Sequence, residues 1–406
     1  MVNTGDTAFV LVSAALVMVM TPGLAFFYGG LVRRKNVLAI MMQSFISMGV
    51  VTVIWALVGY SLAFSGNVAG LIGNLSWAGL HSVGLRPGPW APHIPALAHF
   101  SFQEMFAIIT PALITGAFAD RVHFKSYLQF LVLWSLLVYV PVTHWIWGGG
   151  FLAKWGVRDF AGGMVVHTTA GFAALASVWV VGARKLSPGE KAVPHNIAFV
   201  GLGTGLLWFG WFGFNAGSAL AANGIAAQAF VNTDIAASVA MCTWTAISWW
   251  RAGKPSIVGA MTGAVAGLAC ITPCAGYVPT WASFLIGLLA GGICFLAVEL
   301  RNRMHWDDAL DVWAAHGVGG MLGSILVGVF AYASVNASGH NGLLAGDAGF
   351  FGKQVAAAAL VAVYSLAVTW LILKVLDHFE PIRVPDTVET EGLDSELEER
   401  SAYSLG

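Results

Sequence analysis

The chain has 406 residues, of which 58% are hydrophobic and only 10% charged, and its formal net charge is -1. Soluble domains carry about 25% charged residues, so this composition excludes an ordinary soluble protein and indicates one that is embedded in a lipid bilayer. The nearly balanced charge also argues against a nucleic-acid partner, which would favour a basic surface.

Eleven apolar runs follow one another along the chain, each close to the roughly 20 residues that a helix needs to cross a bilayer. They predict an all-α, polytopic membrane protein. In chain order the expected spans are 7–32, 38–65, 97–119, 124–147, 160–183, 194–214, 224–250, 256–274, 277–300, 309–332 and 350–377.

Basic residues divide unevenly between the two sides of this predicted bundle. Connections after odd-numbered spans hold twelve lysines and arginines, whereas those after even-numbered spans hold four. Positive residues mark the cytoplasmic side, so the N-terminus is expected outside and the C-terminus inside. The first run lacks a preceding basic region and is predicted to span rather than to be a signal peptide. Residues 1–378 then form a membrane domain and 379–406 a cytoplasmic tail.

Side chains suited to a small cation gather at the predicted outer ends of three spans. Phe102 and Phe106 start the third span, Trp147 closes the fourth, and Phe214 and Ser218 close the sixth. Ring faces attract a partly desolvated cation by ~0.5–2 kcal/mol, and a hydroxyl adds an acceptor. Aromatic residues also anchor proteins at membrane interfaces, so this pattern alone is not decisive.

Two histidines lie inside apolar spans, and each follows an aspartate by eight positions: Asp159 precedes His167, and Asp308 precedes His316. Ionisable side chains in hydrocarbon are costly and usually face a partner or a pathway. Each histidine taken alone would more simply be a core residue bonded to a backbone, but the matched pair indicates a conducting path.

The matched positions suggest that spans 1–5 and 6–10 are repeats, and an odd number of spans per repeat makes them inverted. Eight helical residues rise about 12 Å, which places His167 and His316 about 12 Å in from opposite faces of a ~30 Å core. They would then differ by roughly 6 Å in depth, close enough for neutral rings to hydrogen-bond. Asp159 is expected to cap its helix, with or without a part in transport, and Asp308 and Asp311 to be structural.

Nothing in the sequence requires a cofactor or a metal. The motif G-x-x-x-x-G-K-[ST] is absent, which argues against an ATP-driven pump. Cys270 and Cys274 share a helix face, but no histidine or carboxylate lies near them in sequence, so we expect them to pack as small residues.

Four motifs in order resemble those of the Amt/Mep/Rh ammonium transporters, and the likeness runs from about residue 7 to the end. The motifs are TPGLAFFYGGLVRRKN (21–36), DFAGGMVVHTTAG (159–171), WFGFNAGSA (211–219) and DVWAAHGVGG (311–320). Trp147, Ser218 and the tail IRVPDTVETEGLD (382–394) place the resemblance in the bacterial Amt branch.

This resemblance implies eleven spans around one pore per subunit, a homotrimer in the bacterial inner (plasma) membrane, and ammonium, ammonia and methylammonium as substrates. The residues that match the family's functional positions fall into four groups. They are Phe102, Trp147 and Ser218 at the recruitment site, Phe106 and Phe214 at the phenyl gate, His167, His316, Trp211 and Thr272 along the pore, and Asp159 as the essential acid.

The tail carries eight acidic residues from Glu380 onward against two arginines. Such a composition is typical of a disordered, solvated segment. The stretch Glu391, Gly392, Leu393 and Asp394 resembles the Amt regulatory segment, which implies control by a PII-type signal protein. We therefore predict a regulatory role for residues 380–394 and disorder for the last dozen.

Two alternatives have different signatures. Some Amt proteins are joined to signalling domains and report ammonium, but the predicted cytoplasmic end here is shorter than such a domain. An intramembrane metal-dependent enzyme would use the two histidines, yet it needs a third ligand, and no H-E-x-x-H or similar set appears in the spans. A non-enzymatic ammonium transporter or channel is the leading prediction.

Overall fold

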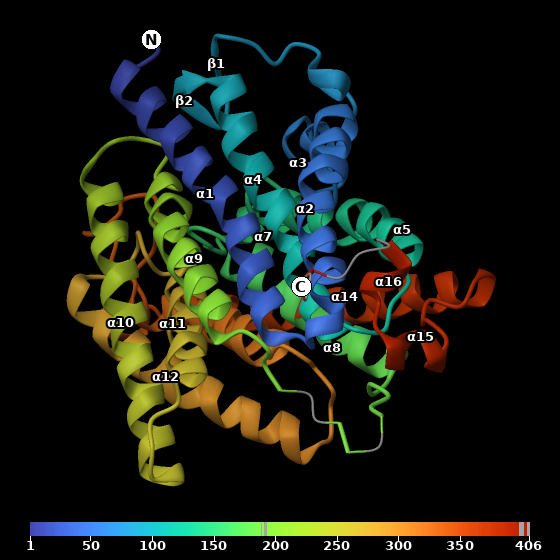
Figure 1. Cartoon of the computed structure of the whole chain (residues 1–406). Helices are drawn as coiled ribbons and strands as arrows, with labels where there is room; N and C mark the ends of the chain where they lie inside the picture. Colours follow the sequence, from blue (N-terminus) through green and yellow to red (C-terminus); the bar gives the residue numbers. More distant parts are fainter. Residues whose placement is uncertain (188, 191–192, 398–401, 404–406) are drawn as a thin grey trace.

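A computed structural model describes residues 1–187, 189–190, 193–397 and 402–403 and shows a mostly helical chain (Figure 1). The α-helices are α1 (Thr4–Leu31), α2 (Val37–Ile54), α3 (Tyr60–Phe64), α4 (Ala96–Ile114), α5 (Phe124–Trp134), α6 (Val140–Ile146), α7 (Phe151–Trp155), α8 (Thr169–Val181), α9 (Ile197–Gly217), α10 (Gly224–Ala252), α11 (Ile257–Ile271), α12 (Thr280–Arg303), α13 (Gly319–Phe330), α14 (Ala348–Phe379), α15 (Asp386–Glu391) and α16 (Asp394–Leu397). A small antiparallel sheet, β1 (Pro87–Gly88) with β2 (Ala91–Pro95), lies in the connection before α4.

Ten helices among the described residues are long and apolar enough to cross a membrane. The predicted span 256–274 contains α11, which has only 15 residues and is too short to count among them. Predicted spans 160–183 and 309–332 begin before the observed helical segments, which start at Gly163 and Trp313. The residues just after Asp159 and Asp308 are not helical, because each aspartate accepts N–H groups from residues further along the chain. The prediction of a mostly helical membrane bundle is confirmed, while eleven spans and an inverted repeat stay predictions.

Four spans contain a π-helical turn, in which the backbone accommodates one extra residue per turn. Trp55–Gly59 joins α2 to α3, and Ser135–Tyr139 joins α5 to α6. Gly163–Thr168 precedes α8 and Trp313–Val318 precedes α13, and these two turns carry His167 and His316. π-Turns occur frequently at functional sites, so the two turns that carry the histidines are candidates for one.

Glycines bring the corresponding helices of the two predicted repeats into close contact. A Cβ atom on Gly203 of α9 would lie 2.3 Å from the backbone nitrogen of Phe27 on α1. A Cβ atom on Gly171 of α8 would lie 2.1 Å from the Cα atom of Gly317, in the turn before α13. Backbones therefore touch where the first and fifth helices of each half meet, as small-residue interfaces in membranes allow.

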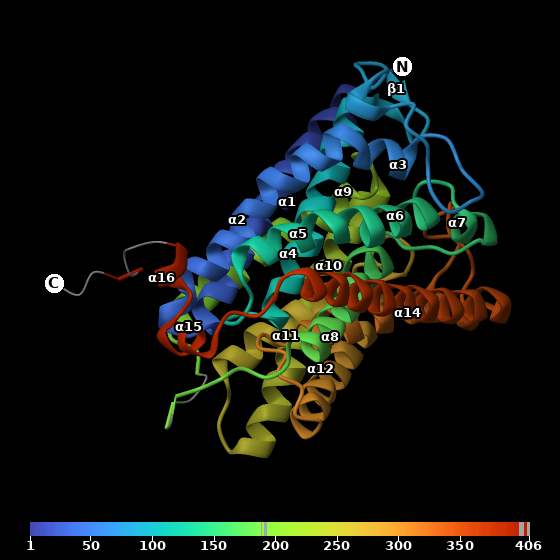
Figure 2. The same cartoon turned by 90° about the vertical axis from the view of Figure 1, so that its right-hand side faces the viewer.

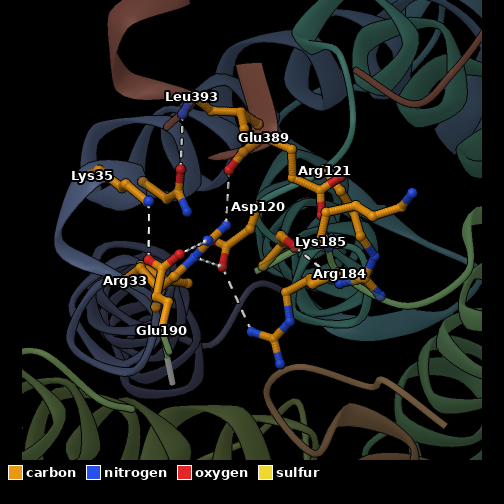
Figure 3. A network of polar contacts seen from close by, with 12 residues as sticks. Arg33, Lys35, Asp120, Arg121, Arg184, Lys185, Glu190, Glu389 and Leu393 are labelled. Atoms are coloured by element: carbon orange, nitrogen blue, oxygen red, sulfur yellow. Dashed lines mark hydrogen bonds and ion pairs between the residues drawn. The ribbon is translucent and has the colours of Figure 1, made fainter. Parts of the chain in front are cut away.

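An ion-pair network at one end of the bundle joins the connections that follow α1, α4 and α8 (Figure 3), and Asp307 extends it to the connection that follows α12. Asp120 Oδ2 lies 3.1 Å from Arg33 Nε and 3.6 Å from Arg184 Nη1, and Arg184 Nη2 lies 2.7 Å from Asp307 Oδ1. These are all odd-numbered connections of the predicted order, so they share one face of the bundle. The tail helices α15 and α16 lie at this same end, opposite the N-terminus (Figure 2).

The charges in this network stabilise each other. Burial alone would raise the pKa of Asp307, but the hydrogen bonds from Arg184 and the charges of Arg121 and Arg184 outweigh burial and lower that pKa to about 2. An unfolded aspartate titrates near pH ~3.9. The network therefore contributes its full stability above that pH and loses it as the pH falls toward 2.

We expect Gly171→Ala to destabilise the protein by about 1–3 kcal/mol, because the new methyl group meets backbone atoms that have no room to move. Thermal unfolding in detergent measures the change. Gly49→Ala is the matched control: Gly49 lies in α2, is exposed, and a Cβ atom there meets nothing within 4 Å. Equal unfolding temperatures for the two variants would contradict the prediction.

Candidate functional site

Asp159 caps the π-helical turn that carries His167. Its Oδ1 accepts the N–H groups of Gly162 and Gly163 at 2.8 and 2.7 Å, and its Oδ2 accepts those of Met164 and Val165 at 2.7 and 3.1 Å. The first N–H groups of a helix have no partner within the helix, so this single carboxylate satisfies all four. The predicted capping role of Asp159 is confirmed.

Asp308 has the corresponding place before the second turn, but its carboxylate accepts fewer hydrogen bonds than that of Asp159. Its Oδ2 accepts the N–H of Trp313 at 2.7 Å, and Arg301 donates to its main-chain carbonyl. Asp308 is 1% exposed. Both histidine-bearing turns are thus held at their start by a buried aspartate, as the matched spacing in the sequence suggests.

The two histidines meet in the middle of the bundle. His167 Nδ1 and His316 Nδ1 are 3.2 Å apart, and the rings are nearly parallel, with centroids separated by 5.2 Å. In such a bond one ring donates its Nδ1–H and the other accepts it. The donating ring then has a lone pair on Nε2, and the accepting ring has an Nε2–H when it is neutral. The pair offers one acceptor and one donor to a passing molecule.

Aromatic rings continue the stack from His167 toward the end of the bundle that bears Asp159. His167 stacks on Phe214 with centroids 5.9 Å apart, and Phe214 lies 4.2 Å from Phe106. Phe106 in turn contacts Phe102 at 5.0 Å and Trp147 at 5.8 Å. The resemblance assigned these five residues to successive parts of one predicted pathway. In the structure their rings form one continuous column.

Three further polar contacts fix the surroundings of this column. The indole of Trp147 donates to the carbonyl of Asp159 at 2.8 Å, which connects the rings to the capped turn. The hydroxyl of Ser218 donates to the carbonyl of Phe214 at 2.8 Å, so its lone pairs stay available as acceptors. Trp211 Nε1 donates to Thr272 Oγ1 at 2.9 Å beside His167.

A narrow cavity surrounds the histidine pair and is apolar apart from the two imidazoles and the indole. Its free volume is about 10 Å³, about one water-sized sphere. It is lined by Met20, Leu24, Phe27, Ile109, Leu113, Val166, His167, Leu207, Trp211, Phe214, Val265 and His316. The aliphatic members carry no signal in the sequence, because apolar residues fill every span.

Within the part of the chain that the structure describes, no group of three or more histidine, cysteine, aspartate or glutamate residues is arranged to hold a metal ion. Cys270 and Cys274 are buried, and Cys274 Sγ donates to the carbonyl of Gly323 at 3.2 Å.

The predicted regulatory segment is docked rather than free. The N–H of Leu393 donates to Asn36 Oδ1 at 2.8 Å, and Asp394 Oδ1 accepts the N–H of Ala39 at 2.9 Å, so the segment holds the start of α2. Glu391 is exposed. Gly392 approaches Lys35 so closely that a Cβ atom on it would lie 2.6 Å from the lysine carbonyl oxygen.

Glu389 is a buried acidic residue of the tail to which the sequence pattern assigned no role of its own. Glu389 is 0% exposed, its Oε2 accepts from Arg383 Nη2 at 2.8 Å, and its Oε1 accepts the N–H of Lys185. Ser395, Glu396 and Leu397 lie in α16, so the prediction of disorder is wrong for these three residues. Residues 398–401 and 404–406 are outside the described part of the chain.

The model of the Ammonium Transporter Family matches residues 8–403. The chain belongs to the ammonium transporter family. The family predicted from the motifs is thereby confirmed. Since ten helices among the described residues are also long and apolar enough to cross a membrane, the chain is a multi-pass membrane protein.

Relatives in the ammonium transporter family cover nearly the whole chain. The ammonium transporter of Bacillus subtilis is 47% identical over 401 residues, 98% of each chain. The ammonium transporter Amt1 of Archaeoglobus fulgidus is 43% identical over 402 residues, 99% of this chain and 100% of that protein.

Solved structures of this family have the same fold. Candida albicans Mep2 superposes with a TM-score of 0.91 at 35% identity, covering 100% of this chain and 94% of that chain. A protein described as a sensor Amt protein superposes with a TM-score of 0.88 at 27% identity, covering 96% of this chain and 97% of its own.

We expect Asp159→Asn to destabilise the protein by about 2 kcal/mol or more. The carboxylate accepts four N–H groups on its two oxygens, whereas the asparagine amide has a single acceptor oxygen. Thermal unfolding tests this. Asp347→Asn is the control, since Asp347 caps α14 through one bond to the N–H of Phe350 and asparagine caps equally well. A stable Asp159→Asn variant would show that the four bonds contribute little.

Proposed function

We propose that this member of the ammonium transporter family moves ammonium across a membrane and conducts it as ammonia past the histidine pair. The observation that carries the proposal is the 3.2 Å contact between His167 Nδ1 and His316 Nδ1 inside an otherwise almost wholly apolar cavity. A paired donor and acceptor suit a small neutral molecule with N–H groups and a lone pair. They do not suit an alkali-metal ion such as K⁺ or Na⁺, which prefers several oxygen ligands.

Ammonium is recruited, in this proposal, where Phe102, Trp147 and Ser218 meet outside the ring column. Ring faces attract the cation electrostatically, and a hydroxyl lone pair of Ser218 accepts one of its N–H groups. The Trp147 indole is held in place by its bond to the Asp159 carbonyl. Asp159 also adds negative charge near this site, and this lowers the cost of bringing a cation there.

Phe106 and Phe214 form the gate, and their centroids, 4.2 Å apart, leave no space for a molecule between the rings. Passage requires at least one ring to rotate. A bare or hydrated metal ion gains little from such an opening, because the gate offers no oxygen ligands in place of water. Ammonia, which is neutral after giving up a proton, avoids that desolvation cost.

Selectivity then follows from acid–base chemistry. K⁺ and Na⁺ have no proton to release, so they keep their charge and their hydration cost. Ammonium leaves its proton before the dry section, and the ammonia exchanges hydrogen bonds with the Nε2 atoms of His167 and His316. Whether the proton crosses separately decides between electrogenic and electroneutral transport. Current recordings on reconstituted liposomes with ammonium, methylammonium and K⁺ answer that question and test the substrate.

We also propose a homotrimer in a plasma (bacterial inner) membrane with an outer N-terminus and a cytoplasmic tail that receives a PII-type signal protein. The common face shared by the basic connections and the tail supports the orientation, and the docked segment 392–394 supports a role for the tail. The homotrimer, the particular membrane and the PII-type partner rest on the resemblance to the bacterial Amt branch. Ammonium sensing, suggested by the sensor Amt neighbour, is the second candidate. A transport assay separates the two, since a pure sensor would move no substrate.

We expect the double variant His167→Ala and His316→Ala to fold but to lose discrimination against K⁺ or to lose ammonium transport altogether. The substitutions remove the donor and acceptor and widen the dry section. Liposome currents in ammonium and K⁺ measure the effect, with His93→Ala as the control, because its side chain is exposed in β2. Unchanged exclusion of K⁺ together with normal ammonium transport would refute the pore assignment.

We expect Gly392→Ala to undock the tail, because Gly392 has φ +116 and no room for a methyl group against Lys35. Limited proteolysis should cut the tail at least several-fold faster than in the parent protein. Glu391→Ala is the neighbouring control and should leave the cleavage rate unchanged, since Glu391 is exposed. Equal cleavage of all three proteins would contradict the docking role of Gly392.

A further inference from the structure

The two aspartates that start the histidine-bearing turns differ in how fully their oxygens are used. Asp159 accepts four N–H groups, two on each oxygen. Asp308 Oδ1 has no hydrogen-bond partner among the described residues, although the residue is 1% exposed. Leaving a buried carboxylate oxygen unpartnered costs free energy. Capping alone therefore accounts for Asp159 but not for Asp308.

Neighbouring carboxylates in the same connection form ion pairs with arginines, although Asp311 Oδ1, like Asp308 Oδ1, accepts no hydrogen bond from the described residues. Asp307 Oδ1 lies 2.7 Å from Arg184 Nη2, and Asp311 Oδ1 lies 3.2 Å from Arg301 Nη2. Arg301 reaches Asp308 only through the main-chain carbonyl, and Arg121 bonds to the carbonyl of Asp307 instead. The charges of both arginines act on Asp308, yet neither donates a hydrogen bond to its carboxylate.

Tyr28 connects Asp308 to the cavity. Its hydroxyl donates to the carbonyl of Leu113, a cavity-lining residue, at 2.8 Å. Its ring packs over Gly116, where a Cβ atom would lie 2.9 Å from the tyrosine Cζ and 2.7 Å from Val312. The charge of Asp308 acts on the Tyr28 phenol. Asp308 therefore acts electrostatically on the phenol that bonds to the cavity wall at Leu113, two helical turns beyond Phe106 on α4.

We propose that Asp308 is the inner proton-exchange residue of this transporter, where ammonia that has passed the histidine pair regains a proton. The inference rests on the proposed function. The carboxylic acid O–H bond breaks as a new N–H bond forms, which yields ammonium and a carboxylate. A water molecule at the inner face then returns a proton to the carboxylate and leaves as hydroxide, so that ammonia and water have become ammonium and hydroxide, and no electrons are transferred.

Two properties of the site favour this step. Burial raises the pKa of Asp308 and outweighs the opposing effects of the Arg301 charge and of the N–H groups of Trp313 and Val312, so the acid form is more populated than in an exposed aspartate. The unpartnered oxygen is also free to hold the new ammonium ion briefly. The charged and titratable groups around it are Arg301, Arg121, Tyr28, Asp311 and Asp307.

The test measures initial ammonium uptake into proteoliposomes at several internal pH values. Uptake by the parent protein should rise as the internal pH falls, because the acid form donates the proton. Asp308→Asn should be at least about tenfold slower and independent of internal pH. Asp347→Asn is the control and should keep the parent profile, because Asp347 caps α14 through one bond to the N–H of Phe350 and asparagine caps equally well.

Parent-like rate and pH profile in a folded Asp308→Asn variant would overturn the proposal. If that variant does not fold, Asp308→Glu decides: a pH-dependent uptake with a displaced midpoint supports the inference, and a pH-independent uptake overturns it. Parent protein that moves no ammonium at any internal pH would overturn the proposed function itself, and this result is distinct from a defect confined to Asp308 variants.

Discussion

The site depends on one steric constraint, the near-contact of two backbones at Gly171 and Gly317. These glycines lie one turn from His167 and next to His316, so their closeness sets the distance between the imidazoles. A second glycine, Gly320, faces His167 directly, since a Cβ atom on it would lie 2.5 Å from the histidine Cβ. Larger side chains here would separate the rings and leave two isolated buried histidines in place of a hydrogen-bonded pair.

Each histidine also depends on an unusual local backbone. A π-helical turn rotates the side chains that follow it, and each turn here is fixed at its start by a buried aspartate. Asp159 accepts four N–H groups and acts as a rigid support. Asp308 retains an unused oxygen, and this difference between similar halves would give the two ends of the proposed path different chemistry.

Much of the fold was predictable because lipid imposes long apolar helices, and rare ionisable residues within them stand out. This is why Asp159, His167 and His316 were found from their spacing. The π-turns were not predictable, since hydrophobic patterns do not report one extra residue per turn. The burial of Glu389 was also missed, because its partners are distant in sequence and acidic tails usually remain solvated.

The small free volume beside the histidines has a kinetic consequence. In the proposed pathway, a cavity that accommodates about one water-sized molecule would carry ammonia in single file, so each occupant would have to leave before the next one enters. Flux through such a passage saturates as the outside concentration rises. A bulkier amine that enters the cavity but leaves slowly would block the passage of ammonia. Such a competing substrate would therefore inhibit transport simply by occupying the cavity.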